Sequence, residues 1–358
     1  MGGSMLIVRA PVRISFAGGG TDLPAYYERH GGFVVSTTIN KYFYVFVDRS
    51  GPDGVQISSS DYRVFTRHRR SELPLWDGDL GLVKAALHEF GCDTGLSLFL
   101  ASEVPPGTGL GSSSAVAVAL VKALSTLRGW ALTRAEIAAY ACVLELDRLN
   151  SPIGKQDQYA AAFGGINAMS FTSAGVAVES VRMPIEAQER LQRNLLLFFT
   201  GAARSANAIL QQQQRASADD RGTAVAALHS IKAAAMETLR CLERGDLRGF
   251  GELLAESWEH KKRLTSGISN PQVDEFYELA RRHGALGGKL AGAGGGGFLM
   301  LYCEEPYQAA VTEALEGAGL FRLAFRFERG GAQVLMNALA RPATGLLPEP
   351  RGMVSTHA

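Results

Sequence analysis

Residues 105–120, with the sequence PPGTGLGSSSAVAVAL, combine three alternating glycines with three serines and an alanine-rich apolar run. Alternating glycines let backbone N–H groups come close together and point at one object. A helix that begins at Ser112 adds unpaired N–H groups and a partial positive charge at its first turn. The serine hydroxyls could cap this helix, and they could also bind Mg²⁺, which prefers oxygen ligands. The stretch therefore has the chemistry of a cradle for phosphate groups.

Other interpretations of this stretch compete with the cradle. A flexible strand-to-helix turn with a serine N-cap needs no ligand at all. Gly107, Gly109 and Ser112 only roughly follow the GxGxxG dinucleotide pattern, and no βαβ unit follows them. A Walker A loop is excluded because GxxxxGK[ST] occurs nowhere in the chain. If the stretch binds phosphate, it does so in another fold.

The composition limits the class of protein. The 358-residue chain has 46% hydrophobic and 20% charged residues and a formal net charge of +1. It can bury a substantial core, and its near-zero net charge argues against a nucleic-acid partner. No apolar run reaches the roughly 18–20 residues of a membrane span, and the leader is too short for a signal peptide. We therefore expect a soluble cytoplasmic protein without a membrane partner. Its four cysteines lack a CxxC pair, so we expect buried thiols rather than a disulfide frame or a zinc site.

The hydrophobic pattern predicts two domains. The N-terminal domain, 5–185, contains strands at 6–17, 33–48, 55–66, 95–102, 165–171 and 175–182 and helices at 79–90, 112–128, 134–149 and 156–163. The C-terminal domain, 190–340, contains helices at 204–217, 222–243, 246–265, 271–283 and 305–317 and strands at 194–200, on both sides of a glycine loop in 286–303, and at 320–327. Residues 1–4 look like an expression-tag remnant, with Met5 as the natural start, and 341–358 like a loose tail.

Two further glycine-rich stretches, APVRISFAGGGTDLP (10–24) and KLAGAGGGGF (289–298), each adjoin an apolar strand. With 105–115 they resemble, in order and spacing, the three motifs of the GHMP kinases. This is the superfamily of galactokinase, homoserine kinase, mevalonate kinase and phosphomevalonate kinase. The resemblance covers nearly the whole chain. It implies an α+β, two-domain GHMP kinase fold, with a ribosomal-protein-S5-domain-2-like N-terminal domain and a ferredoxin-like α/β sandwich at the C-terminus. It also implies ATP as co-substrate and Mg²⁺ as cofactor.

Several stretches are similar to the branch of this family that phosphorylates the anomeric hydroxyl of sugars. They are VRISFAGGGTDLPAYY (12–27), GGFVVSTTINKY (31–42), GKQDQYAAAFGG (154–165), TGAARSA (200–206) and ESWEHKKRLTSGISNP (256–271). The resemblance favours a kinase that converts D-glycero-D-manno-heptose 7-phosphate to the 1,7-bisphosphate, in nucleotide-activated heptose biosynthesis. L-Fucose kinases share several of the stretches, so an L-fucose or other free-sugar 1-kinase is the alternative. A GHMP-type decarboxylase and a non-catalytic binding module are more remote alternatives. The partner is a small sugar or sugar phosphate, and a homodimer is compatible with the sequence.

The resemblance also assigns roles to residues around the proposed phosphoryl transfer. It implies Mg²⁺ binding by Ser113 and Glu145, with Asp147 as a rival carboxylate. Asp157 corresponds to the catalytic aspartate, which orients the acceptor hydroxyl and takes its proton. Arg13 corresponds to a basic residue that would keep this aspartate ionised and stabilise the moving phosphoryl group. The implied nucleotide-binding residues are Pro106, Gly107, Thr108, Gly109, Leu110, Gly111, Ser112, Ser113 and Ser114.

The acceptor is expected to bind at Gly19, Gly20, Thr21 and Asp22. Asp22 corresponds to a sugar-binding aspartate of galactokinase-like members, but Gly19 and Gly20 replace the Glu-His pair found there, which makes room for a different or bulkier sugar. A phosphorylated acceptor needs cations. The candidates are Lys155 and Arg204, followed by Lys41, Lys261 and Lys262. The glycines of the third motif, Gly292, Gly294, Gly295 and Gly296, are expected to approach the nucleotide phosphates or to buttress the cradle.

Overall fold

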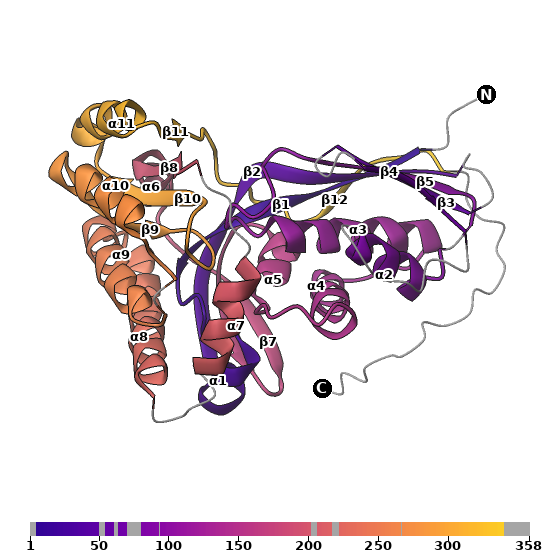
Figure 1. Cartoon of the computed structure of the whole chain (residues 1–358), viewed down its shortest axis with the longest axis horizontal. Coiled ribbons are helices and arrows are strands. Elements are labelled where there is room, and N and C mark those ends of the chain that lie inside the picture. Colours follow the sequence, from indigo (N-terminus) through magenta and orange to yellow (C-terminus); the bar gives the residue numbers. More distant parts are fainter. Residues whose placement is uncertain are drawn as a thin grey trace.

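The computed structural model describes residues 5–49, 54–60, 64–69, 80–92, 94–201, 206–216, 222–265 and 267–339. Over these ranges the chain forms an eight-stranded sheet and a four-stranded sheet, each with its own helices. Figure 1 shows the helices within residues 81–163 along one face of the larger sheet, and the helices within residues 223–317 around the smaller sheet at the opposite end of the molecule. The expected α+β architecture with two units is therefore confirmed.

Two long antiparallel strands, β1 (Met5–Ala17) and β2 (Gly32–Asp48), form the spine of the larger sheet. Both are rich in Val, Ile and Phe, which fit a pleated and half-buried surface. One half of β2 pairs with β5 (Leu96–Ser102) and the other half with β6 (Ile166–Thr172). The register of β1 against β2 shifts between Pro11 and Val12, at the place where the neighbours of β2 change. The next residue, Arg13, lies at this division of the sheet.

The remaining elements of the N-terminal unit complete this sheet or cover it. The strands are β3 (Val55–Ser59), β4 (Val64–His68), β7 (Gly175–Ser180) and β12 (Gln333–Asn337). The sheet order is β12-β1-β2-β5-β3-β4, with β6 attached to β2 and β7 attached to β6. The helices are α1 (Pro24–His30), α2 (Gly81–Glu89), α3 (Ser112–Arg128), α4 (Arg134–Cys142), the π-helix η2 (Val143–Arg148) and α5 (Gln156–Phe163). Helix α3 is rich in buried alanines, and these small side chains let it pack closely on β1 and β2.

The C-terminal unit has an antiparallel sheet in the order β11-β8-β10-β9. Its strands are β8 (Leu195–Phe199), β9 (Ala285–Leu290), β10 (Phe298–Cys303) and β11 (Phe321–Arg322). Its helices are α6 (Ile185–Asn194), α7 (Ala206–Ala216), α8 (Thr223–Arg244), α9 (Leu247–Lys262), α10 (Pro271–Arg282), the short η3 (Glu305–Tyr307) and α11 (Gln308–Gly317). Strand β10 is buried along its whole length, which explains its continuous apolar sequence.

The structure differs from the sequence expectations in several places. Helix α1 was not expected, and the strand expected at 320–327 is only the two-residue β11. The expected strand at 55–66 is two strands, β3 and β4, which pair antiparallel. The helix expected over 134–149 ends in the π-helical turn η2, and α6 was not expected. The C-terminal domain was expected to span 190–340. Its last strand, β12 (Gln333–Asn337), instead pairs with β1 in the larger sheet. This strand is short and partly exposed, so it has little periodic signal. Residues 1–4 and 340–358 lie outside the described ranges.

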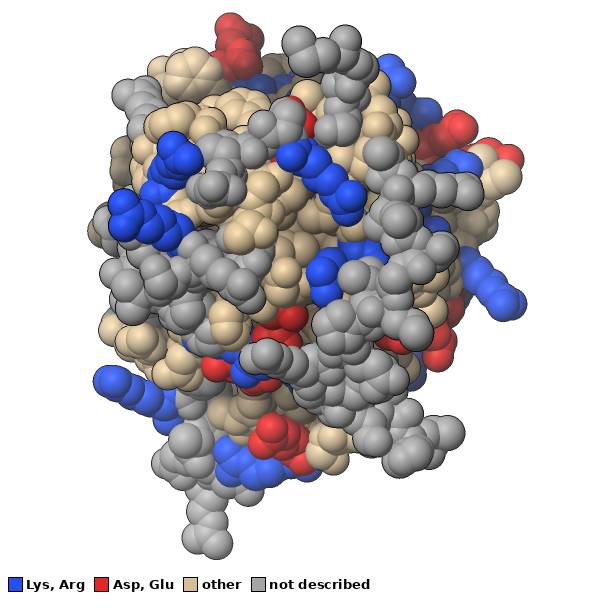
Figure 2. All heavy atoms as spheres, turned by 90° about the vertical axis from the view of Figure 1, so that its right-hand side faces the viewer, with Lys and Arg blue, Asp and Glu red and all other residues tan. Residues whose placement is uncertain are grey.

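Two further expectations concern the surface and the cysteines. All four cysteines are buried and free, as expected. Figure 2 shows basic and acidic side chains side by side with uncharged ones on the face that it presents, in keeping with a net charge of +1. No helix within the described ranges has an apolar stretch long enough to cross a membrane.

Candidate active site

All three glycine-rich stretches line one cleft of about 730 Å³. Residues from β1 and the loop after it form one wall, and the start of α3 and of α5 form another. Helices α7 and α9, strand β9 and the loop 291–296 complete the cleft from the C-terminal unit. The site therefore depends on both units of the chain.

The first turn of α3 presents free backbone donors to this cleft. The N-cap of α3 is Gly111, which has a left-handed backbone (φ +74°), and no side chain caps the helix. The first intrahelical bond is donated by the N–H of Ala115, so the N–H groups of the three preceding serines have no partner within the helix. Ser112 and Ser113 line the cleft. Because no side chain caps the helix, the free N–H groups of its first turn and the positive end of the helix dipole are available to an anion.

The third glycine stretch packs directly against this turn. A Cβ on Gly109 would lie 2.3 Å from the carbonyl oxygen of Ala291, and a Cβ on Gly292 would lie 2.6 Å from the Cα of Gly109. Both glycines have positive φ, at +84° and +71°. The N–H of Phe298 donates to the Thr108 carbonyl (3.2 Å). Side chains are excluded here because two backbone segments touch, and loop 291–297 supports the turn before α3.

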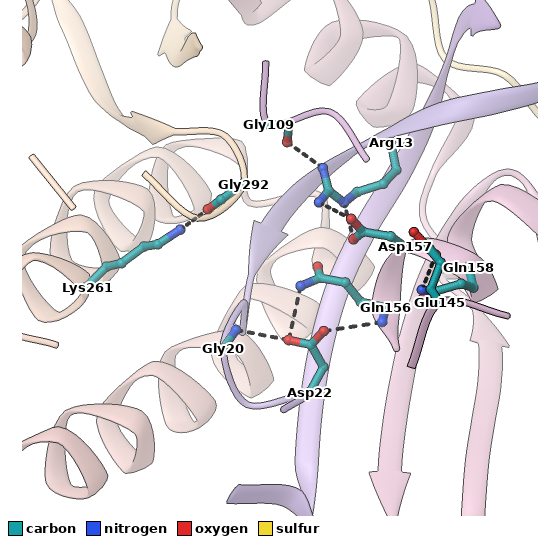
Figure 3. A network of polar contacts seen from close by, with 10 residues as sticks. All are labelled: Arg13, Gly20, Asp22, Gly109, Glu145, Gln156, Asp157, Gln158, Lys261 and Gly292. Atoms are coloured by element: carbon teal, nitrogen blue, oxygen red, sulfur yellow. Dashed lines mark hydrogen bonds and ion pairs between the residues drawn. The ribbon is translucent and has the colours of Figure 1, made fainter. Parts of the chain in front are cut away.

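Arg13 and Asp157 form a bidentate ion pair beneath the turn (Figure 3). Nε of Arg13 donates to Oδ1 of Asp157 at 2.7 Å, and Nη2 donates to Oδ2 at 2.6 Å. Nη1 donates to the carbonyl of Gly109 at 2.6 Å, and the backbone N–H of Arg13 donates to the Leu110 carbonyl at 2.9 Å. Asp157 belongs to the first turn of α5. One arginine thus links strand β1, the glycine turn and the carboxylate.

Asp22 forms the floor of the same cleft (Figure 3). Its carboxylate accepts hydrogen bonds from the N–H of Gly20 (3.0 Å), the N–H of Gln156 (3.2 Å) and Nε2 of Gln156 (3.0 Å). Burial raises the pKa of Asp22, and the nearby charge of Asp157 adds to this rise, whereas the N–H of Gly20 opposes it. Gly154 packs so closely that a Cβ there would lie 1.9 Å from Oδ2. The carboxylate is therefore held in one position by its neighbours.

Glu145 lies behind the turn, on the π-helical segment η2, and is 3% exposed. Nε2 of Gln158 donates to its Oε2 at 2.6 Å. Burial raises the pKa of Glu145 to about 7, although the hydroxyls of Ser114 and Ser113 and the Gln158 amide counter part of the rise. Such a buried carboxyl beside a serine hydroxyl is a suitable oxygen donor set for Mg²⁺. No cluster of three or more His, Cys, Asp or Glu among the described residues could hold a metal, so an ion here also needs oxygens from a ligand or water.

The basic residues expected to bind a phosphate on the acceptor do not all lie at the cleft. Lys261 and Lys289 line the cleft. Lys155 is not among the lining residues, and its ammonium lies 5.2 Å from the centre of the Tyr27 ring. Lys262 pairs with Glu259 at 2.8 Å and does not line the cleft either. Arg204 lies outside the described residues.

The structure therefore brings together most, not all, of the expected residues. Those that line the cleft are Arg13, Gly19, Gly20, Asp22, Pro106, Gly107, Gly109, Gly111, Ser112, Ser113, Asp157, Lys261, Gly292, Gly294 and Gly296. Thr21 does not: its buried hydroxyl accepts from the N–H of Phe33 (3.0 Å) and donates to the Gly18 carbonyl (2.8 Å), which fixes the loop. Thr108, Leu110, Ser114 and Gly295 lie behind the lining.

The lining residues that were not expected from the sequence include Gln156 and Lys289. Gln156 immediately precedes Asp157, but glutamine is common at the start of helices and carries no specific signal. The signal for Lys289 was present, because a lysine within an otherwise apolar strand before a glycine loop is unusual.

Comparison with known proteins places this chain in a family. The pattern of the GHMP kinases N terminal domain matches residues 80–165, and that of the GHMP kinases C terminal domain matches residues 238–319. The D-glycero-alpha-D-manno-heptose 7-phosphate kinase of Campylobacter jejuni is 30% identical over 331 residues, which are 91% of this chain and 97% of that protein. The chain belongs to the GHMP kinases. It is thus an ATP-dependent phosphotransferase that acts on a hydroxyl group, as the motifs implied.

Other relatives of this GHMP kinase include sugar kinases. The L-fucokinase/L-fucose-1-P guanylyltransferase of Bacteroides fragilis is 30% identical over 340 residues, which are 85% of this chain but 35% of that protein. The crystal structure of a D-glycero-D-manno-heptose 1-phosphate kinase from Bacteroides thetaiotaomicron has a TM-score of 0.75 at 27% identity, and the match covers 92% of this chain and 99% of that one. A putative sugar kinase from Campylobacter jejuni has a TM-score of 0.74 at 28% identity, over 92% and 98% of the two chains. The expected two-domain GHMP kinase fold is confirmed.

Proposed function

We propose that this kinase transfers the γ-phosphoryl group of ATP to the anomeric hydroxyl of D-glycero-D-manno-heptose 7-phosphate, which becomes the 1,7-bisphosphate. The observation that carries the reaction type is the bidentate Arg13–Asp157 pair, which lies between the glycine turn and Asp22 in one cleft. Support for the acceptor comes from the similarity to the Campylobacter jejuni heptose 7-phosphate kinase over nearly the full length of both chains.

In the proposed reaction, Asp157 orients the acceptor hydroxyl and receives its proton as the phosphoryl group moves. Arg13 holds both carboxylate oxygens, so the carboxylate keeps a defined direction relative to the acceptor. Its contact with the Gly109 carbonyl ties the pair to the turn that would bind the triphosphate. The guanidinium also supplies positive charge where the transferred group carries negative charge. Asp22 is proposed to accept hydrogen bonds from sugar hydroxyls.

We further propose that Mg²⁺ binds to the Ser113 hydroxyl and the Glu145 carboxylate, together with ATP oxygens and water. The support for a metal ion at this place is Glu145, which is buried and makes no ion pair with any described Lys or Arg. A cation beside it would favour the ionised carboxylate. When bound, the ion neutralises phosphate charge during transfer.

The alternative acceptor is L-fucose or another free sugar, which the similarity to the Bacteroides fragilis fucokinase favours. Such an acceptor brings no phosphate, so it would not need a cationic subsite away from the reacting group. A cytoplasmic location and a homodimer remain predictions from the sequence.

The test is a measurement of ATP consumption over a panel of free and phosphorylated sugars, with phosphorus NMR of the products. We expect the heptose 7-phosphate to have the highest kcat/KM, and the new phosphorus signal to couple to the anomeric proton. The same heptose without its phosphate is the matched control and should be at least tenfold poorer. A hexose or L-fucose preferred tenfold or more would show that the acceptor is wrong, and a phosphate on another carbon would show that the position is wrong.

A further inference from the structure

Two buried lysines face the cleft from the C-terminal unit. Lys261, in the last turn of α9, is 6% exposed, and Lys289, on β9, is 4% exposed. Both line the same cleft as Arg13, which comes from β1. Fully buried lysines are rare unless something pairs with them. Their surroundings therefore indicate what they bind.

Neither lysine has a carboxylate partner in the described part of the chain. Nζ of Lys261 donates to the carbonyl of Gly292 (Figure 3), and Nζ of Lys289 donates to the carbonyl of Phe16 at 3.2 Å. An ammonium group has three donors, so each lysine keeps donors beyond this one contact. A buried cation with spare donors favours an anionic ligand.

The nearby carboxylates are already engaged. Asp157 is bound by Arg13, and Asp22 accepts from Gly20 and Gln156. Burial, and after it the charge of Arg13, lower the pKa of Lys261 to about 8, and the charges of Asp22 and Asp157 oppose this shift. The pKa of Lys289 is well below its ordinary value because of burial and then the charges of Lys261 and Arg13. An anion bound beside these lysines would favour the charged form of both ammonium groups.

The contacts of Lys261 indicate which anion this is. Its partner Gly292 packs against Gly109, and the carbonyl of Gly109 accepts from Nη1 of Arg13. Lys261 is therefore anchored to the loop 291–297 and Arg13 to the glycine turn that this loop touches, and the two side chains come from different units of the chain (Figure 3). An anion between them lies at the end of the phosphate cradle, next to Asp157. The terminal phosphoryl group of ATP fits this place better than a phosphate at the far end of the acceptor.

We propose that Lys261 is a further catalytic residue, which binds the non-bridging oxygens of the phosphoryl group opposite Arg13 during transfer. In this step the bond from the γ-phosphorus to the β-phosphate oxygen breaks, and a bond to the acceptor oxygen forms. The acceptor proton passes to Asp157, and ADP leaves. Lys261 gains and loses no proton; it stabilises charge on the transferred group. The inference rests on ATP as the donor and not on the identity of the sugar.

The test compares Lys261→Met with Lys262→Met. Lys262 is the matched control because it follows on the same helix, pairs with Glu259 and does not line the cleft. Loss of one such stabilising group typically lowers kcat about 10²–10³-fold. We expect this loss for Lys261→Met, with less than about a threefold change in either KM, whereas Lys262→Met should keep wild-type kinetics. Lys261→Gln, which keeps a donor for the Gly292 carbonyl but no charge, should show the same loss.

A second measurement needs no acceptor. Titration with ADP, alone and with aluminium fluoride as a mimic of the transferred group, should show that Lys261→Met and Lys261→Gln bind ADP as the wild type does. Both should bind the fluoride complex at least tenfold more weakly. Equal affinity for that complex in wild type and variants would overturn the proposal. So would a raised KM for a phosphorylated acceptor with unchanged kcat, because Lys261 would then bind the acceptor's phosphate. These outcomes are independent of the sugar panel, so a wrong acceptor and a wrong role for Lys261 can be told apart.

Discussion

Replacement of Gly154 by alanine tests whether Asp22 holds the acceptor. A Cβ at position 154 would lie 1.9 Å from Oδ2, 2.4 Å from Cγ and 2.9 Å from the carbonyl oxygen of Asp22. Gly154 does not have a left-handed backbone, so alanine introduces a clash without conformational strain. The Asp22 carboxylate must move, and the variant therefore displaces one side chain of the cleft without removing it.

The expected loss of stability comes from the clash at residue 154 and from the hydrogen bonds that the Asp22 carboxylate would lose. Overpacking of a buried site costs roughly 1–3 kcal/mol. The carboxylate accepts bonds from the N–H of Gly20 and from two donors of Gln156, and loss of one bond to a charged group costs about 1.5 kcal/mol or more. We expect the free energy of unfolding to fall by about 2–4 kcal/mol. If Asp22 binds the acceptor, the acceptor KM should rise about tenfold or more, which corresponds to about 1.4 kcal/mol, while the KM for ATP stays within about threefold.

The assay combines urea unfolding, followed by circular dichroism, with steady-state kinetics in which ATP and acceptor are varied separately. Gly317→Ala, in α11, is the matched control, since a Cβ there meets nothing within 4 Å and helical alanine is about 0.5–1 kcal/mol more stable than glycine. Wild-type stability in Gly154→Ala would refute the placement of Asp22 beside residue 154. Lower stability with an unchanged acceptor KM would refute only the acceptor-binding role.

Three further predictions concern the reacting groups. Asp157→Asn should lower kcat about 10²–10⁴-fold while ADP binding, measured by calorimetry, is retained; more than a tenth of wild-type kcat would contradict its role as base. Glu145→Gln should raise the half-saturating Mg²⁺ concentration for activity at least tenfold in a Mg²⁺ titration, whereas Asp147→Asn should not; equal shifts would remove Glu145 as the ligand. Because the pKa of Lys261 is about 8 in the folded protein, kcat/KM for ATP should fall as the pH rises through about 8, where free enzyme loses this proton. Lys261→Arg should abolish that decline, and a decline of the same size in this variant would assign it to another group. The lowered pKa also predicts that Lys261 makes the free energy of unfolding rise between about pH 8 and 10.5, because the unfolded chain still holds the proton there; urea unfolding of wild type against Lys261→Met checks this slope.

Local sequence determined much of what positions the site. Helices α3 and α5 begin and end where the periodicity placed them, at 112–128 and 156–163, because their apolar spacing and flanking glycines act over a few residues. The three glycine motifs were recognisable for a similar reason: only glycine tolerates positive φ at Gly109 and Gly292, so the backbone demand is visible in the residue type. Arg13 was found through the first of these motifs and Asp157 through the stretch GKQDQY, although 144 positions separate the two residues.

What only the tertiary structure decided is the environment of the charged groups. Lys155 stands two residues from Asp157 in the chain yet lies against Tyr27, while Lys261 and Lys289, from the other unit, line the cleft. The pairing of β12 with β1 also depends on the tertiary structure, since an edge strand needs a partner that is distant in the sequence. The residue types and their local periodicity determined helices α3 and α5, the glycine turns and the family. Burial and pairing of an ionisable side chain depend on what other segments bring beside it, and that information is not contained in spacing along the chain.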